Sequence, residues 1–250
     1  MFVLEWLTSG SEMVRREFEH KFSKTCGHED IKHILSAICD GLKDEIRWPN
    51  AAERRALCAT QGVFNRVIGY TDGCEQFYKR TGDDAENRRN ASGKKKRCTK
   101  STLAAVDRNG YFIYVKCGHD GSLNDRQQFT MSALYTNCGE YFTGDEVLAG
   151  DGAFAGDGPI LTSFSILDTR EKQMFNATFT EGRLGIENAF GRVQAFFPLL
   201  GRNKKYWPYD EETLQLAINA SCLLHNFLLR SRHVMYNQAA NPSARYAEYM

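Results

Sequence analysis

The spacing of apolar residues changes near residue 60. Before that point, residues 12–22 and 29–42 carry apolar side chains three and four positions apart, which is the period of an amphipathic helix. After it, short apolar runs alternate with helical patterns. We therefore predict a small helical region over residues 1–60, an α/β domain over residues 61–230, and a polar, flexible tail over residues 231–250.

The two predicted N-terminal helices are separated by a short stretch, Thr-Cys-Gly, that contains a glycine. This arrangement is compatible with a DNA-binding helix-turn-helix. The second helix begins with His28, Glu29 and Asp30, however, and acidic side chains at that end are unsuited to approaching phosphates. A plain helical hairpin is the preferred interpretation, and the helix-turn-helix stays open as the alternative.

Several short segments of the α/β region favour strands. The Asn109-Gly110 pair separates two of them and predicts a β-hairpin, because both residue types accept a positive φ angle. Another run ends at Asp72, where Gly73 is expected to stop the strand, although Asp-Gly is also a common turn pair. The predicted strands cover residues 67–72, 101–108, 111–117 and 146–151, the last of which ends in Asp151.

Three longer segments favour helices. The first, residues 124–137, should place Phe129, Ala133 and Leu134 inward. The third begins after Asp210, a good N-cap residue, and is so apolar that it should lie buried with His225 as a hydrogen-bonded core residue. The second, residues 184–197, has an apolar stripe of Ile186, Phe190, Val193 and Phe197.

Acidic residues stand where several hydrophobic patterns begin or stop. They are Asp72, Asp125 and Asp151, and Glu187 lies one helical turn after Arg183. Carboxylates gathered at one edge of a sheet repel one another unless divalent cations lie between them, and oxygen ligands favour Mg²⁺ or Mn²⁺. We predict that the three aspartates face one shallow cavity. Arg183 either pairs with Glu187 as an ordinary exposed helix pair or holds a substrate phosphate.

One dense basic block stands out from a chain whose formal net charge is only +1. Lys94, Lys95, Lys96 and Arg97 follow one another and suit a nuclear localisation signal, a phosphate-binding patch or a solvated loop. His119, beside Asp120, is predicted either to contact substrate or to lie in a loop. The near-neutral total means that any nucleic-acid footprint must be local.

The composition excludes other chemistries. The eight cysteines include no CxxC pair, which argues against structural zinc and suits reduced thiols inside the cell. No apolar run reaches the roughly 18 residues of a membrane helix, so we expect no membrane association. Phosphate-binding P-loops, dinucleotide-binding GxGxxG motifs and GxSxG nucleophile motifs are absent from the sequence.

Five sequence blocks resemble, in order, those of Harbinger/PIF-type transposase-derived nucleases, which are DDE superfamily endonucleases. The blocks are VIGYTDG, GSLND, LAGDGAF, RLGIENAFGRVQAFFPLL and ASCLLHNFLL, within residues 60–230. The resemblance implies an RNase H-like mixed sheet flanked by helices and a metal site that cuts DNA. It also implies that Asp72, Asp125 and Glu187 are catalytic, that Asp151 joins them as a metal ligand, and that the cofactor is Mg²⁺ or Mn²⁺.

The chain departs from the family's pattern beside these acids. Cys74 and Glu75 replace a Thr-His pair, and Asn124 replaces a histidine before Asp125. In the block that holds the fourth acid, Ala153 and Phe154 replace Gly and Tyr. The functional expectation is a DNA endonuclease, and the alternative is a catalytically silent, domesticated transposase that acts as a DNA-associated scaffold.

The resemblance also raises expectations about context. Related nucleases often work with a separate Myb-like DNA-binding protein, and we expect such a partner and a nuclear location, with some protein in the cytoplasm. Arg183 and the basic block of residues 94–97 are the predicted substrate contacts.

Overall fold

The structure is a computed structural model of the 250-residue chain. It describes residues 4, 7–8, 24–156, 158–200, 207 and 209–240, and the side chains of all of these except 24–27 and 233–240. The predicted first helix, residues 12–22, and the last part of the predicted tail, residues 241–250, lie outside the described residues.

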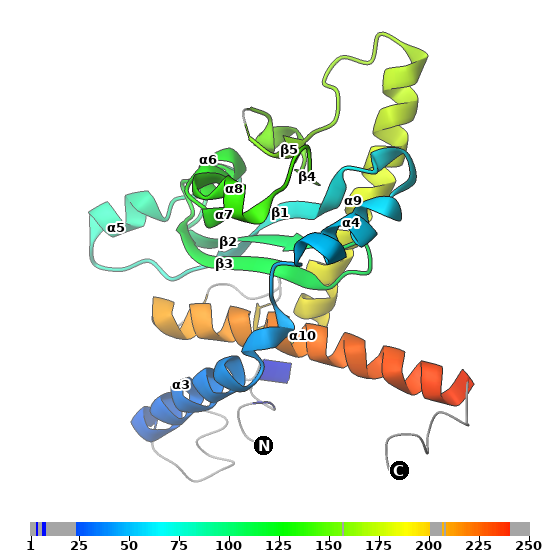
Figure 1. Ribbon diagram of the computed structural model, residues 1–250. Coiled ribbons are helices and arrows are strands. Elements are labelled where there is room, and N and C mark those ends of the chain that lie inside the picture. The colour runs from blue at the N-terminus through cyan, green and yellow to red at the C-terminus, as the bar shows by residue number, and fades with distance from the viewer. Residues whose placement is uncertain are drawn as a thin grey trace.

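A five-stranded mixed sheet forms the centre of the molecule, in the order β3-β2-β1-β4-β5 (Figure 1). β2 runs antiparallel to both β1 and β3, and β4 and β5 add to the β1 side as parallel strands. The strands are β1 (Val67–Phe77), β2 (Thr99–Val106), β3 (Phe112–Asp120), β4 (Val147–Ala149) and β5 (Ile160–Leu161). The predicted α/β class, with a mixed sheet flanked by helices and consistent with an RNase H-like fold, is confirmed.

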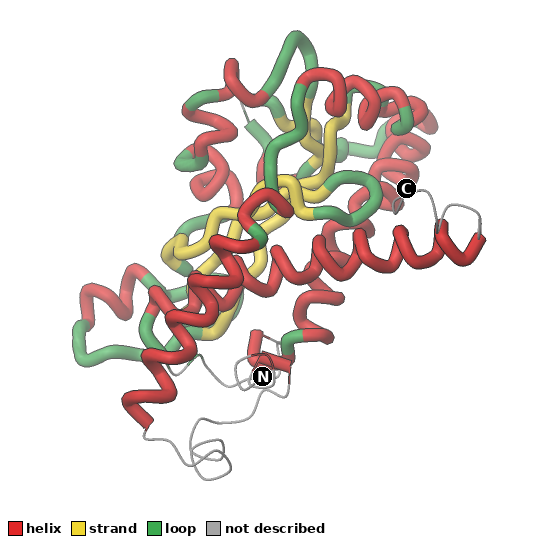
Figure 2. The backbone as a smooth tube through the Cα atoms, turned by 60° about the horizontal axis from the view of Figure 1, so that its bottom comes forward, coloured by secondary structure: helices red, strands yellow, loops and turns green. Residues whose placement is uncertain are grey.

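Helices cover both faces of this sheet. One hydrophobic core lies between the sheet and α3, α9 and α10, and a second lies between the opposite face and α4, α6 and α7. Figure 1 shows α3 and α10 below the sheet and α6 to α8 above it, and Figure 2 shows the strands between helices from a second direction. The helices are α3 (Lys24–Gly41), α4 (Ala51–Ala59), α5 (Asp84–Arg89), α6 (Asp125–Thr130), α7 (Ala133–Thr136), α8 (Cys138–Tyr141), α9 (Arg170–Phe196) and α10 (Glu211–Ala240). Within the described ranges, no helix is long and apolar enough to span a membrane.

The prediction that β1 ends at Asp72 is wrong. The strand continues to Phe77, because β2 pairs with it along its length and Gly73 is opposite Leu103 in the ladder. On the other side, β4 pairs with β1 only as far as Tyr70, which lies opposite Ala149. Asp72 is therefore inside a strand, just beyond the point where the neighbouring strand has ended.

The predicted hairpin between β2 and β3 is confirmed, but its turn differs from the expected one. Gly110 has a φ of 83°, whereas Asn109 does not have a positive φ. The side chain of Asp107 accepts hydrogen bonds from the backbone N–H groups of Asn109, at 2.8 Å, and Tyr111, at 3.0 Å. These bonds stabilise a longer loop that needs only one residue in the left-handed region.

Two of the three predicted helices are longer than their patterns indicated, and the other is broken. The buried stripe of Ile186, Phe190, Val193 and Phe197 is confirmed, but α9 begins at Arg170, after the N-cap Thr169. The helix α10 has its predicted cap at Asp210 and continues to Ala240, into the stretch predicted as a flexible tail. The segment 124–137 divides into α6 and α7, with Phe129 and Leu134 buried as predicted and Ala133 only partly buried.

Two polar side chains of α10 form hydrogen bonds with the backbone of the β2–β3 hairpin. His225 is 4 % exposed, and its Nε2 lies 3.0 Å from the carbonyl oxygen of Gly110, which confirms it as a hydrogen-bonded core residue. The amide of Asn226 accepts from the backbone N–H of Phe112 and donates to its carbonyl oxygen. Because a buried backbone group without a partner is costly, these bonds fix where α10 lies across β3.

A buried ion pair fastens α4 to the loop before β4. Arg54, 5 % exposed, donates from Nε to Glu146 at 2.7 Å and from its two terminal nitrogens to Pro49 and Thr143.

We expect Arg54→Ala to lower the free energy of unfolding by about 3–5 kcal/mol, because it leaves a buried carboxylate without its partner. Urea denaturation measures this loss. Arg55→Ala, on the exposed side of the same helix, is the control and should change stability by less than about 0.5 kcal/mol; equal effects of the two variants would contradict the assignment.

Candidate functional site

Three aspartates converge at the place where β4 leaves β1. One carboxylate oxygen from each of Asp72, Asp125 and Asp151 lies within 4.8 Å of the other two. Asp72 comes from β1, Asp125 is the first residue of α6, and Asp151 follows β4. Three elements that are distant in the sequence thus bring the three predicted acids together.

Local hydrogen bonds hold two of the carboxylates and the helix start that carries the third. Asp72 accepts from the backbone N–H of Gly73 at 2.8 Å, and Asp151 accepts from that of Ala153 at 2.8 Å. Asp125 is placed by a capping box in which the side chains of Asn124 and Gln127 bond reciprocally to the backbone at the start of α6. Asn124 therefore has a clear structural role as the helix cap.

Gly73 is explained by the approach of Asp125. A Cβ atom on residue 73 would lie 2.3 Å from Oδ1 of Asp125, closer than any non-bonded contact allows. The glycine therefore does not end the strand. It provides the space in which a carboxylate from the opposite side of the sheet can reach Asp72.

The pKa values of two aspartates are raised, because burial and neighbouring carboxylates disfavour their charged forms. Burial, together with the charges of Asp151 and Asp125, raises the pKa of Asp72 to about 6, although the Gly73 hydrogen bond and Arg183 oppose the rise. Burial and the charge of Asp151 also raise the pKa of Asp125, and Lys94 opposes this. The carboxylates would be stabilised by a positive charge placed among them.

The residues present fit a divalent cation. The donors are carboxylate oxygens from three separate elements, they are partly buried, and they are close enough to share an ion. Hard oxygen donors of this kind favour Mg²⁺ or Mn²⁺ over zinc, which prefers nitrogen and sulfur. Asp72, Asp125 and Asp151 are the residues that would hold such an ion.

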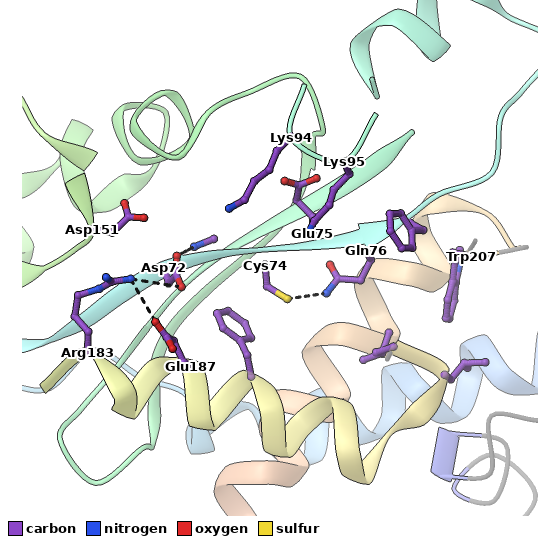
Figure 3. Close-up of a pocket in the computed structure, with 15 residues that line it drawn as sticks. Asp72, Cys74, Glu75, Gln76, Lys94, Lys95, Asp151, Arg183, Glu187 and Trp207 are labelled. Atoms are coloured by element: carbon purple, nitrogen blue, oxygen red, sulfur yellow. Dashed lines mark hydrogen bonds and ion pairs between the residues drawn. The ribbon is translucent and has the colours of Figure 1, made fainter. Parts of the chain in front are cut away.

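Glu187 lies beside this group but is not part of it. Its Oε1 is 3.8 Å from a terminal nitrogen of Arg183, and the same nitrogen is 4.0 Å from Oδ2 of Asp72. The Glu187 side chain is 54 % exposed, whereas Arg183 is only 18 % exposed. In this structure a guanidinium therefore occupies the position between the predicted closing glutamate and the aspartates (Figure 3).

Close packing of α9 on β1 brings these two residues to the site. A Cβ on Gly182 would lie 2.5 Å from the hydroxyl oxygen of Tyr70, so the absence of a side chain lets the helix approach the strand. Ile186 and Phe190 are buried on the same side of the helix. This packing fixes the part of α9 that carries Arg183 and Glu187 next to Asp72.

A cavity of about 510 Å³ opens from the acids along β1. Asp72, Asp151, Arg183 and Glu187 line one end, and Lys94 and Lys95 line the side across from α9 (Figure 3). The cavity continues past Cys74, Glu75, Gln76 and Phe77 to Trp207. An elongated hollow with acids at one end and lysines along its side suits a polyanion that also needs a cation.

The basic block is divided by the structure. It forms an exposed loop, as one of the three interpretations predicted, yet Lys94 and Lys95 line the acidic cavity whereas Lys96 and Arg97 line a different hollow. Lys94 also lowers the pKa of Asp125, which places its charge close to the acids.

The alternative that His119 lies in a loop is wrong, whereas its contact with substrate stays a prediction. The residue lies within β3, opposite Ser101, and is 7 % exposed, because the strand continues to Asp120 instead of ending near Cys117. Burial lowers the pKa of His119. It is thus neither a loop residue nor a lining residue of the acidic cavity.

Glu75 is a residue that sequence reasoning did not assign to the site. It lies two positions after Gly73 on β1, accepts a hydrogen bond from the Thr99 hydroxyl at 3.0 Å, and raises the pKa of Asp125. Alternate residues of a strand face the same side of the sheet, so Glu75 faces the same side as Gly73. Once β1 is known to continue past Gly73, this period of two would have identified Glu75 as a site residue. The seven cysteines whose side chains are described form no disulfide bond.

Comparison with known proteins agrees with this geometry. A family model described as DDE superfamily endonuclease matches residues 71–226, more than half of the chain. No curated protein and no solved structure was found to match. The matched region begins immediately before Asp72 and includes Asp125, Asp151, Arg183 and Glu187. With the fold, the three converging aspartates and this match together, the chain belongs to the DDE superfamily endonucleases.

Proposed function

We propose that this protein is a divalent-metal-dependent endonuclease that hydrolyses phosphodiester bonds of DNA. The observation that carries the proposal is the convergence of Asp72, Asp125 and Asp151 within 4.8 Å of one another, beside a cavity that Asp72 and Asp151 line together with Arg183 and Lys94. Acids that gather in this way are suited to metal-assisted phosphoryl transfer, and the flanking cations are suited to the phosphates of the substrate.

Each side chain has a distinct task in this proposal. Bound cations would activate the attacking water and neutralise charge on the leaving oxygen. Asp72, Asp125 and Asp151 hold the cations, and Lys94 and Lys95 bind phosphates of the strand that enters the cavity. Arg183 neutralises the acids before substrate arrives and then contacts the phosphate at the site of cleavage.

Glu187 completes the ligand set in this proposal. Its side chain is largely exposed and shares Arg183 with Asp72, so a small movement of the guanidinium toward a substrate phosphate frees the carboxylate for a cation. Asp72, Asp125 and Glu187 are then the catalytic acids, and Asp151 is the fourth ligand.

The finer assignment rests on the sequence blocks. We propose the Harbinger/PIF type within the superfamily, a Myb-like protein as the partner for DNA binding, and a nuclear location with some protein in the cytoplasm. The formal net charge of +1 supports a partner, because this chain offers little long-range attraction to DNA.

A second candidate is a silent, domesticated relative that serves as a DNA-associated scaffold. The observation that favours it is the position of Arg183 between Asp72 and Glu187, where its guanidinium offers a positive charge to these two acids without metal. In that case the acids would have a structural role only, and the protein would neither cut DNA nor bind Mg²⁺.

A nicking assay separates the two candidates. The purified full chain is incubated with supercoiled plasmid in Mg²⁺ or Mn²⁺, and with EDTA as the control. We expect conversion to the open-circular form only with metal. We also expect Mg²⁺ at about 100 times its dissociation constant to stabilise the fold by about 2.7 kcal/mol, as thermal unfolding would show. The absence of both cleavage and stabilisation would contradict the nuclease and support the scaffold.

A further inference from the structure

A second and larger hollow lies next to the acidic cavity. Its volume is about 1120 Å³, and residue Phe77 lines both cavities. Its lining includes four basic residues, Lys79, Arg80, Lys96 and Arg97, and two aromatic ones, Phe77 and Tyr78. None of the described residues that line it is acidic. The charge of this hollow is therefore opposite to that of the acidic end of the first cavity.

The loop of residues 92–97 forms the wall between the two cavities. The backbone N–H of Ser92 donates to the carbonyl oxygen of Arg97, and that of Lys96 donates to the carbonyl oxygen of Ser92, both at 2.9 Å. Lys96 has a φ of 56°, which is uncommon for a residue with a side chain. This closed loop places Lys94 and Lys95 in the first cavity and Lys96 and Arg97 in the second. The loop therefore presents positive charge on both sides, beside the acids in the first cavity and within the second cavity.

Phe77 offers an aromatic face at the junction. The Arg97 guanidinium carbon lies 5.4 Å from the centre of its ring, in a cation–π contact. Phe77 is the last residue of β1. Its carbonyl oxygen accepts a hydrogen bond from the backbone N–H of Trp207, and it pairs with Thr99 of β2. A planar group already covers this ring, and a nucleobase is a planar group of the same kind, which stacks on aromatic side chains.

We propose that the second cavity binds a single-stranded flank of the DNA substrate, next to the strand that enters the acidic cavity. Arg80 and Arg97 contact its phosphates, and one unpaired base takes the place of the Arg97 guanidinium on the Phe77 ring. A single strand is the favoured occupant because a duplex keeps its bases stacked on one another and leaves an aromatic face unused. This inference rests on the proposed function, since the acidic cavity defines where the cleaved strand lies.

Fluorescence anisotropy tests the inference with two labelled DNA probes. One is a blunt duplex, and the other is the same duplex with a single-stranded extension of about 10 nucleotides, which is within the size that single-strand sites cover. The full-length chain is used in EDTA, so that no cleavage competes. We expect the extension to increase affinity on the order of tenfold, because one stacked base contributes about that much.

Variants of the aromatic face give the sharpest readout. Phe77→Leu should reduce the preference for the extended probe to what the phosphate contacts alone provide, and Phe77→Tyr, which keeps a ring, should retain it in full. Thermal unfolding of both variants shows whether the fold is intact. An extension that adds no affinity to the wild-type chain, or a preference that persists undiminished in a folded Phe77→Leu variant, overturns the proposal.

The charged residues are tested with a matched control. Arg80→Ala with Arg97→Ala should weaken binding of the extended probe and reduce the slope of log affinity against log salt by about 1.4, as expected for two single-strand phosphate contacts. The control, Lys43→Ala with Arg55→Ala, removes the same charge from exposed residues that line neither cavity, and should change the slope little. Equal slopes for the two double variants overturn the proposal in favour of a partner other than DNA.

The outcomes separate this inference from the proposed function. If wild-type protein cleaves plasmid and the second-cavity variants bind DNA as the wild type does, the nuclease stands and the inference fails. If the Phe77-dependent preference is present without metal-dependent cleavage, the inference stands and the catalytic proposal fails.

Discussion

Replacing Asp72 with asparagine is expected to abolish metal-dependent cleavage and, at the same time, to make the metal-free protein more stable. Loss of a residue that only orients a metal ligand typically lowers activity by about 10–100-fold, so loss of a ligand shared by the whole site should exceed 100-fold. Plasmid nicking in Mg²⁺ measures the first effect, and urea denaturation in EDTA measures the second.

The gain in stability follows from the raised pKa of Asp72. Its pKa rises from the ordinary value of 3.8 to about 6 in the folded chain, with a side chain only 22 % exposed. Between these values the Asp72 carboxyl binds more protons in the folded state than in the unfolded state, so its contribution to stability falls as pH rises from about 4 to about 6 and is then level. The corresponding loss is at most about 3 kcal/mol. We expect Asp72→Asn to recover about 1–3 kcal/mol at pH 7 and almost nothing at pH 4.

Two comparisons test the origin of this effect. Asp40→Asn removes the same charge from an exposed position on α3 and should leave both stability and cleavage unchanged. Saturating Mg²⁺ should stabilise the wild-type chain but not Asp72→Asn, which would remove or reverse the difference between them. A destabilised Asp72→Asn at pH 7 in EDTA would show that the carboxylates do not repel one another in the folded state.

Glu187→Gln is expected to separate catalysis from stability in a different way. The substitution keeps the shape of the side chain and removes the charge that would bind a cation. Because Glu187 is 54 % exposed and its contact with Arg183 is long, at 3.8 Å, the change in metal-free stability should be within about 0.5 kcal/mol. If Glu187 is a catalytic ligand, cleavage should nevertheless fall by more than about 100-fold.

The matched control is Glu181→Gln, on the exposed face of the same helix and outside the cavity lining. It changes the charge of α9 by the same amount and should cleave as the wild type does. Wild-type cleavage that persists undiminished in Glu187→Gln would remove this residue from the catalytic set. The three aspartates that already converge would then be the whole metal site.

Local patterns in the sequence were sufficient for much of the fold. The hairpin at Gly110, the buried stripe that includes Ile186 and Phe190, and the cap at Asp210 depend on neighbours within a few residues. Such features are encoded by side-chain period and turn chemistry, which the chain displays directly. Where a non-local partner decides the outcome, as in the extension of β1 beyond Gly73, the same reasoning predicted the wrong end.

For the site, the sequence by itself singled out three acids, Asp72, Asp125 and Asp151, at positions where hydrophobic patterns begin or stop. Only the tertiary structure decided that they meet within 4.8 Å, because spacing along a chain does not fix distances between elements. It also decided that Arg183 lies between Glu187 and Asp72, and that the loop of residues 92–97 divides its lysines between two cavities. These outcomes depend on how closely α9 packs on β1 and where β4 stops, and packing of elements distant in the sequence leaves no periodic signal in it.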